Sequence, residues 1–345
     1  GKDVVWVIRM ISRAKAAYAY IVARTKVMKS KLLKPEDFRK LLNMSFDEIM
    51  RFLEETEYKK EIDEMAYKYT GPKLLDYALF TNLAKTYRKI YNVSFGDAKM
   101  LIGNYLKRWD VWNIINILRG KNANLPSEVI EETLVPAGEF SIDYLRSLLT
   151  KDISEIVKDL EGTPYHEALS KFGSAPMSAI EDELWKIYYK NLLAIKASDF
   201  ESRVFLNFVK MEIDLRNVKT LLRLKAEGDT AEEIIARIIP GGYELTEDEA
   251  RKLATMSFDE MVKSLEGFWF WKVSGVTDLA RTEIEFDKIW IEAIAKRASN
   301  YPLSILPVLQ YIVLKKVEVD DLRILGWGKW FGLPNEEIEK QMVII

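Results

Sequence analysis

The chain has 345 residues, and its hydrophobic content of 48% is enough to form two or three packed domains. Its 51 basic and 53 acidic residues give a net charge of −2, so no overall basic excess indicates nucleic-acid binding. It has no cysteine and a single histidine, His166, which excludes disulfides, thiolate metal sites and transition-metal clusters.

The first predicted element is a helix near the N-terminus with a run of basic residues at its end. These residues are Arg24, Lys26, Lys29, Lys31 and Lys34. Cations favour a helix C-terminus because they offset the negative end of the helix dipole. The alternative is a contact with anionic lipid headgroups or acidic partner loops. Insertion into a membrane is not expected, because no large apolar face accompanies the charges.

A sixteen-residue segment then recurs along the chain. Residues 39–54 and 251–266 are identical at ten of sixteen aligned positions, and residues 146–161 form a weaker copy. The copies start 107 and 105 residues apart, so we expect a domain-sized unit of about a hundred residues to be used three times. Three equal units can close into a ring around an axis.

Each copy begins with residues that are typical of a helix N-terminus. Ser45 and Glu48 match a capping box, in which each side chain bonds the other residue's backbone N–H. Ser257 and Glu260 repeat this pattern, and Asp152 supplies a variant in the middle copy. A structural helix start explains this recurrence without any active site.

A second pattern, D-x-x-N followed after five residues by R, occurs at residues 110–119 and 214–223. Asp and Asn at this spacing share one helix face, whereas the Arg lies elsewhere. Turns rich in Pro and Gly follow at residues 134–138 and 238–242. Six candidate residues result: Asp110, Asn113, Arg119, Asp214, Asn217 and Arg223. They either contact a partner or make capping and hydrogen bonds within their own domain.

Long stretches with helical periodicity cover residues 72–91, 178–208 and 277–298, with a possible break at Ser198–Asp199. The most apolar run, residues 305–314, is too short to span a bilayer. No sustained alternation predicts a sheet.

We therefore predict an all-α fold of three similar helical domains. The expected domains are residues 1–105, residues 106–209 and residues 210–345. Residues 318–323 faintly repeat residues 212–216, so the chain is expected to start and end in the same kind of element. The C-terminal helices are expected to close on the N-terminal region.

The sequence allows two interpretations for each of two aromatic segments. Residues 268–271, four consecutive large aromatics, are expected on a helix, where they either pack between domains or contact a partner. Residues 326–332 are glycine-rich but lack the strand–loop–helix context of a phosphate cradle. They predict a tight turn with buried indoles or, alternatively, an aromatic contact surface that includes Trp327 and Trp330.

No catalytic residue, metal site, cofactor site or small-molecule substrate is predicted. Asp320–Asp321 is the nearest approach to a magnesium-binding pair, and no second acidic motif is placed to match it. An enzyme using carboxylates and magnesium is therefore the weakest alternative. A helical scaffold that binds soluble protein partners is the stronger one.

Five spaced segments together resemble a known family. They read VARTKVMKSKLL (22–33), RKLLNMSFDEIMRFLEETEY (39–58), DVWNIINILRG (110–120), FVKMEIDLRNVKTLLRLKAEG (208–228) and KWFGLPNEEIE (329–339). Over nearly the whole chain this order is similar to the C subunit of archaeal-type (A/V-type) rotary ATPases, whose eukaryotic relative is the d subunit of the V-type enzyme. The middle copy departs from the other two at Lys151–Ser154.

The resemblance implies three helical domains around a pseudo-threefold axis, shaped like a funnel. It implies a non-catalytic rotor subunit on the cytoplasmic face of the membrane, peripheral to it, between the central shaft made of the D and F subunits and the membrane proteolipid ring. Such a protein passes torque between ATP chemistry and ion transport. The candidate partner contacts are Asp110, Asn113, Arg119, Asp214, Asn217, Arg223, Trp327 and Trp330.

Overall fold

The computed structural model describes the backbone of residues 1–345 and all side chains except those of Ile8, Met10, Ile11 and Ser12. Within this description the chain forms nineteen helices, and its only β-structure is an isolated bridge between Phe172 and Ala175. The predicted all-α fold is confirmed. Among the residues described, no helix combines the length and the apolar content that are needed to cross a bilayer.

The helices pack into two compact units. Unit 1 consists of Gly1–Asn116, Leu125–Leu149 and Ala293–Ile345, and unit 2 consists of Ile117–Asn124 and Thr150–Glu292. These units reflect packing, whereas the three expected domains were drawn from sequence repeats, so the repeat boundaries stay a prediction.

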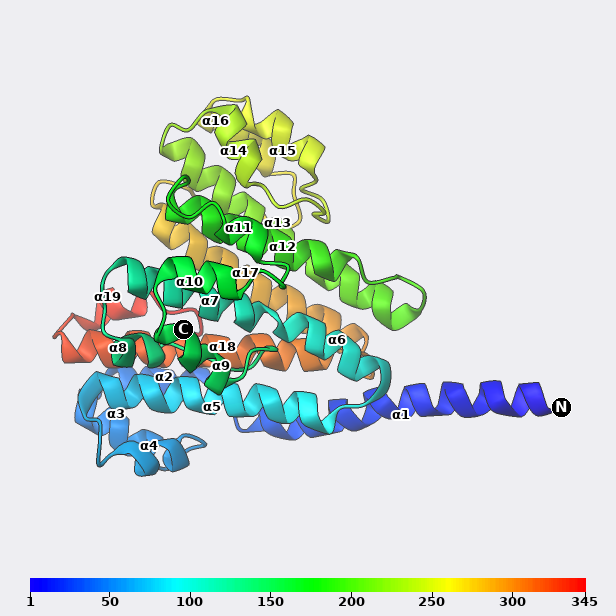
Figure 1. The fold of residues 1–345 in the computed structure, drawn as a ribbon, viewed down its shortest axis with the longest axis horizontal. Coiled ribbons are helices and arrows are strands. Elements are labelled where there is room, and N and C mark those ends of the chain that lie inside the picture. The colour runs from blue at the N-terminus through cyan, green and yellow to red at the C-terminus, as the bar shows by residue number, and fades with distance from the viewer. The chain divides into compact units, whose positions relative to one another are not determined.

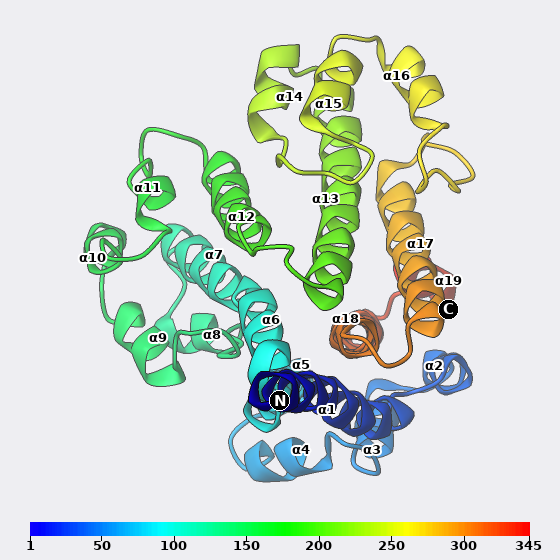
Figure 2. The same cartoon turned by 90° about the vertical axis from the view of Figure 1, so that its right-hand side faces the viewer.

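Unit 1 is built around three long helices. Helices α5 (Gly71–Val93) and α18 (Leu306–Trp330) lie side by side, and α1 (Lys2–Ser30) packs against both (Figures 1 and 2). Both α5 and α18 have a proline in the first turn, where its missing N–H leaves no bond unmade. The other helices of this unit are α2 (Pro35–Leu42), α3 (Phe46–Leu53), α4 (Lys59–Met65), α6 (Gly96–Leu106), α8 (Ser127–Glu131), α9 (Ile142–Leu149) and α19 (Asn335–Glu339).

Unit 2 is built around α13 (Phe200–Ala226). Helices α14 (Ala231–Arg237), α15 (Glu247–Ala254) and α16 (Phe258–Leu265) gather at one end of α13, and α12 (Met177–Leu193) packs along it (Figures 1 and 2). The short helices α10 (Ile153–Asp159) and α11 (His166–Leu169) complete the unit. Helices α7 (Arg108–Asn122) and α17 (Leu279–Asn300) each have residues in both units.

The expected break in the long stretch 178–208 is present. Helix α12 ends at Leu193, and Asp199 caps the start of α13 by accepting a hydrogen bond of 2.8 Å from the Ser202 N–H. An aspartate in this position satisfies an amide that the helix itself leaves without a partner.

The recurring caps are also confirmed. Ser45 accepts from the Glu48 N–H at 3.2 Å, and the Glu48 carboxylate accepts from the Ser45 N–H at 3.4 Å. Ser257 and Glu260 form the same pair at 3.3 and 3.4 Å, and Asp152 caps α10 with its carboxylate. Three short helices, α3, α10 and α16, therefore begin in the same way.

Residues 268–271 do not form a helix, so that prediction is wrong. Helix α16 ends at Leu265, and the aromatic run lies in the loop that follows. A loop backbone can point consecutive side chains in different directions, and Phe270 is fully buried beside Phe286. The aromatics pack within unit 2 rather than between domains, and a partner contact by the half-buried members of the run stays a prediction.

Residues 326–330 continue α18, so the expected tight turn is wrong for them, and a turn forms only at Phe331 and Gly332, where Gly332 has a φ of +72°. A Cβ atom on Gly326 would lie 2.1 Å from the Leu75 side chain of α5, and one on Gly328 would lie 2.7 Å from Ile338 of α19. These glycines allow neighbouring helices to approach α18 closely.

Candidate functional site

The first D-x-x-N pair holds a loop of unit 1 against α7. The Asp110 side chain is buried, and its two carboxylate oxygens accept from the Glu139 and Phe140 N–H groups, both at 3.0 Å. Asn113 donates to the Val135 carbonyl at 2.8 Å and accepts from the Val135 N–H at 2.7 Å. The pair thus replaces the hydrogen bonds that this loop backbone loses on burial.

The second pair does the same in unit 2. Backbone N–H groups of residues 243–245 donate to the Asp214 carboxylate at 2.8–3.1 Å, and the Trp269 indole N–H donates to it at 2.8 Å. Asn217 makes the same reciprocal pair with Ile239, at 2.8 and 2.9 Å. Asp214 and Asn217 are both fully buried.

A third aspartate makes a related contact. Asp321, buried on α18, accepts from the Val343 and Ile344 N–H groups at 3.0 and 2.8 Å. The faint sequence echo at residues 318–323 therefore corresponds to a shared contact, a buried aspartate that holds a returning backbone segment. Its neighbour Asp320 pairs instead with Lys316 at 2.6 Å. Among the described residues, no group of three potential metal ligands occurs.

The glycines of the two Pro-Gly turns make these contacts possible. A Cβ atom on Gly138 would lie 2.3 Å from Asp110 Oδ1, and one on Gly242 would lie 2.4 Å from Asp214 Oδ1. Only glycine lets the backbone approach the carboxylate so closely.

Burial changes the acidity of both aspartates. Desolvation raises the pKa of Asp110 from its ordinary value to about 6, although the backbone N–H donors oppose this shift. Desolvation also raises the pKa of Asp214, opposed by the Glu244 N–H and the Trp269 indole. The energetic cost of burying a charge here exceeds the gain from its hydrogen bonds.

These contacts favour one of the two interpretations of the motif. Asp110, Asn113, Asp214 and Asn217 are buried and bonded within their own units, as capping and loop-holding residues are. A direct contact between any of these four side chains and a partner stays a prediction, and it would require the loops over them to move.

The two motif arginines lie at the surface. Arg119 makes a two-pronged ion pair with Glu181, at 2.5 and 2.7 Å, while 61% of its side chain remains exposed. The hydrogen bonds to Glu181 raise the pKa of Arg119. Arg223 is exposed on α13.

The two candidate tryptophans differ from each other. The Trp327 indole donates to Asp76 at 3.1 Å, and Arg323 pairs with the same carboxylate at 2.9 Å. Trp330 is 54% exposed and meets Phe46 edge-on, with 5.2 Å between ring centroids.

Trp330 belongs to an exposed apolar group at the end of α18. Its other members are Phe331, 69% exposed, and Leu333, 43% exposed, and we call these three residues the C-terminal aromatic patch. The sequence indicated an aromatic surface here but did not select Phe331 or Leu333. Exposed large apolar side chains gathered in one place are typical of contact surfaces.

A family model described as "ATP synthase (C/AC39) subunit" matches residues 21–341 of the chain. The chain belongs to this family. The match includes every candidate residue described above, and it confirms the resemblance seen in the sequence. As a member of the C/AC39 family, the chain is a structural, non-catalytic component of an ATP synthase.

Curated relatives agree with this family over almost the full length of the chain. The C subunit of the A-type ATP synthase of Archaeoglobus fulgidus is 68% identical over 96% of this chain and 97% of its own length. The corresponding protein of Methanococcoides burtonii is 39% identical over 96% of both chains. That of Haloferax volcanii is 31% identical over 94% of this chain and 97% of its own.

In this member of the C/AC39 family, sequence reasoning missed a buried polar network in unit 1. The Tyr58 hydroxyl donates to Glu318 at 2.6 Å, Lys315 donates to that hydroxyl at 3.0 Å, and the Leu33 N–H donates to Glu318 at 2.7 Å. Burial lowers the pKa of Lys315, opposed mainly by the Glu318 charge. A signal was present, because Glu318 precedes Asp321 by three residues, Glu212 precedes Asp214 by two, and Glu212 also accepts from a tyrosine hydroxyl.

Proposed function

We propose that this chain is the C subunit of an A-type ATP synthase rotor, which connects the central shaft made of the D and F subunits to the membrane proteolipid ring. The observation that carries this proposal is the agreement with curated A-type relatives over 94–96% of the chain. In this role the protein transmits torque and so couples ATP chemistry to ion transport.

The helical construction suits a mechanical part. Helix α13 has 27 residues and is therefore about 40 Å long. The loops beside α7 and α13 are held by buried carboxylate and amide groups rather than left mobile. Long helices with fixed loops resist twisting, which a torque-transmitting protein requires.

The proposed location is the cytoplasmic face of the membrane, where the protein is peripheral and sits on the proteolipid ring. The basic end of α1 is compatible with this location, since cations near a membrane surface attract anionic headgroups. Two of these cations already have partners within the chain, because Lys29 donates to Gln310 at 3.2 Å and Lys31 pairs with Glu57 at 3.6 Å.

For the partner contacts we propose the exposed candidates. Arg119, Arg223 and Trp330 present side chains at the surface, and Trp327 stacks on the exposed Phe331 beside Trp330. Asp110, Asn113, Asp214 and Asn217 would act indirectly by fixing the loops above them. A funnel-shaped ring of three repeats is the geometry that we propose for receiving the shaft.

A second candidate function is a helical scaffold for soluble partners outside a rotary motor. The C-terminal aromatic patch is the observation that fits it, since such a surface serves any protein partner. Stable association with a proteolipid ring would exclude this alternative.

Co-elution tests the proposal. The full chain is mixed with purified D–F shaft and, separately, with detergent-solubilised proteolipid ring, and each mixture is passed through a size-exclusion column. We expect stable complexes with both. A folded, helical chain that binds neither would contradict the motor function and leave the scaffold.

A further inference from the structure

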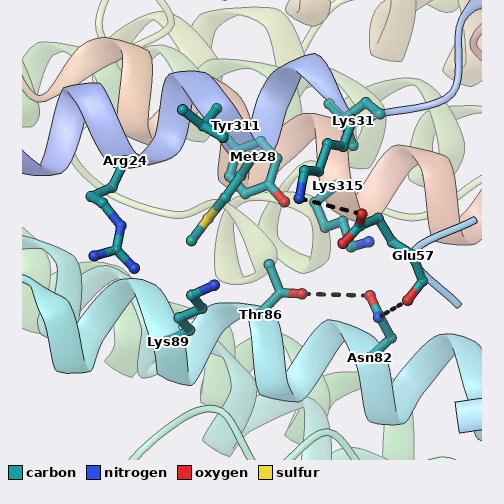
Figure 3. A pocket seen from close by; sticks show the side chains of 11 residues that line it. Arg24, Met28, Lys31, Glu57, Asn82, Thr86, Lys89, Tyr311 and Lys315 are labelled. Carbon is teal, nitrogen blue, oxygen red and sulfur yellow. Dashed lines mark hydrogen bonds and ion pairs between the residues drawn. The ribbon is translucent and has the colours of Figure 1, made fainter. Parts of the chain in front are cut away.

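A cavity of about 190 Å³ lies in unit 1, between helices α1, α5 and α18, and both charged and apolar side chains line it (Figure 3). A space of this size suits one compact group rather than a peptide. Neither the family nor the torque function assigns it a role.

Four cations line this cavity, which we call the basic pocket. Lys31 and Lys315 are partly neutralised, Lys31 by Glu57 at 3.6 Å and Lys315 by Glu318 at 3.9 Å. The other two cations are Arg24 and Lys89. Among the residues that the structure describes, neither has an acidic partner.

Arg24 and Lys89 face the same space from opposite helices. Figure 3 shows the Arg24 guanidinium pointing from α1 toward α5, and the Lys89 ammonium pointing from α5 toward α1. Arg24 is oriented by a hydrogen bond of 2.9 Å to the Tyr20 hydroxyl and by its position over that ring. Arg24 is half-buried and Lys89 is exposed, and two like charges that face each other repel until an anion enters between them.

The other polar side chains in the lining are Glu57, Asn82, Thr86 and Tyr311. Thr86 lies on α5 beside Lys89, and its hydroxyl donates only one long hydrogen bond, of 3.4 Å, to Asn82 Oδ1. That hydroxyl can therefore turn to donate to a ligand. Donors that converge from several directions match the oxygens of a tetrahedral oxyanion, whereas one arginine fork alone would satisfy a flat carboxylate.

We propose that the basic pocket binds a single phosphate group, held by Arg24 and Lys89 with the Thr86 hydroxyl as an additional donor. The group is either free phosphate or the phosphate of an anionic lipid headgroup, since both present the same chemistry. The buried Lys315 ammonium at the end of the pocket adds attraction for an anion. The proposal does not depend on the rotor function.

The test uses inorganic phosphate as the probe and calorimetric titration of the full chain at constant ionic strength. We expect saturable binding of one phosphate per chain, with affinity reduced about tenfold or more in Arg24→Gln and in Lys89→Gln, as expected when one charge-assisted donor is lost. Two matched controls, Lys26→Gln on α1 and Arg88→Gln on α5, remove the same charge from exposed positions outside the pocket lining.

A second measurement separates the two sources of phosphate. Sedimentation with vesicles containing about one-third phosphatidylglycerol in phosphatidylcholine assigns the site to lipid if binding falls in Arg24→Gln and not in Lys26→Gln. If the chain binds phosphate but Arg24→Gln and Lys26→Gln bind the vesicles equally well, the site is assigned to free phosphate. No saturable phosphate binding by the folded chain, or an equal loss in the control variants, would overturn the proposal.

Discussion

Three buried aspartates, Asp110, Asp214 and Asp321, make the same kind of contact at different points of the chain. Each lies on a long helix and accepts hydrogen bonds from the backbone of a segment that returns 22–31 residues later. The repeated D-x-x-N pattern could be read from the sequence, and so could the placement of its Asp and Asn on one face of a helix. The bonding partners could not, because nothing local in the sequence says which distant backbone lies over a helix face.

The acidity of Asp110 leads to a prediction about pH. The unfolded side chain has a pKa near 3.9, and burial raises the pKa of the folded side chain to about 6, so folding takes up a proton between these values. Proton uptake by Asp110 therefore stabilises the folded state fully below about pH 4. Its contribution to the free energy of unfolding falls by on the order of 3 kcal/mol as the pH rises through 6. In Asp110→Asn, which cannot take up that proton, the contribution is absent.

Urea unfolding followed by circular dichroism at pH 4, 5, 6 and 7 checks this prediction. The free energy of unfolding of the wild type minus that of Asp110→Asn should decrease from pH 4 to 7, with most of the fall complete by pH 6. Asp143→Asn is the control, because its side chain is 91% exposed. A difference that is flat or rises with pH would be inconsistent with a raised pKa.

The glycine beside Asp214 leads to a second prediction at the residue scale. A methyl group on Gly242 would lie 2.2 Å from the Leu245 carbonyl oxygen and 2.4 Å from the carboxylate. Gly242→Ala should lower the free energy of unfolding by about 1–3 kcal/mol, the usual cost of overpacking. Gly275→Ala, where nothing lies within 4 Å, should change it by no more than about 0.5 kcal/mol. Equal effects of the two substitutions in urea titrations would contradict the close contact.

At the scale of the element, sequence signals worked where the controlling interaction was local. Capping boxes at Ser45 and Ser257 were predicted correctly because both partners lie within four residues. The break before α13 was signalled by Asp199 for the same reason. Two expectations failed where packing overrides local chemistry. The aromatic run 268–271 is a loop, and Gly326 and Gly328 serve helix packing within α18. Only Gly332, with a φ of +72°, lies in a turn, the one that ends this helix.

The cap of α16 can be tested directly. Ser257→Ala removes the acceptor for the Glu260 N–H and should reduce the free energy of unfolding by about 0.5–2 kcal/mol. Ser264→Ala on the same helix is the matched control, since its hydroxyl is exposed and bonds only weakly to the Met256 sulfur at 3.4 Å. The control should be neutral or slightly stabilising, because alanine is the better helix former. A control that costs as much as Ser257→Ala would mean that the cap contributes nothing specific.

At the scale of the whole molecule, the sequence predicted the helical class and the family and indicated an aromatic surface near Trp330, but it did not identify which side chains are exposed there. Exposure depends on which helices cover which faces, and that is decided by packing across hundreds of residues. Phe331 and Leu333 could be added to Trp330 in the C-terminal aromatic patch only once α18 was seen to end at Trp330.

The C-terminal aromatic patch gives a prediction about binding. Phe331→Ser should weaken binding to the D–F shaft or to the proteolipid ring by about tenfold or more, because exposed aromatics at interfaces often contribute about 2 kcal/mol. Tyr67→Ser removes a side chain that is 84% exposed in the same unit and should leave both affinities unchanged. Unchanged binding of folded Phe331→Ser to both partners would remove the patch from the interface.

The central claim is that this chain connects the shaft to the membrane rotor, and a bridging experiment tests it most directly. Tagged proteolipid ring in detergent is immobilised and incubated with D–F shaft, with and without the full chain. We expect the ring to retain the shaft only when the chain is present, in equal amounts with it. Retention of the shaft without the chain, or no retention when the chain itself is bound, would contradict the coupling role.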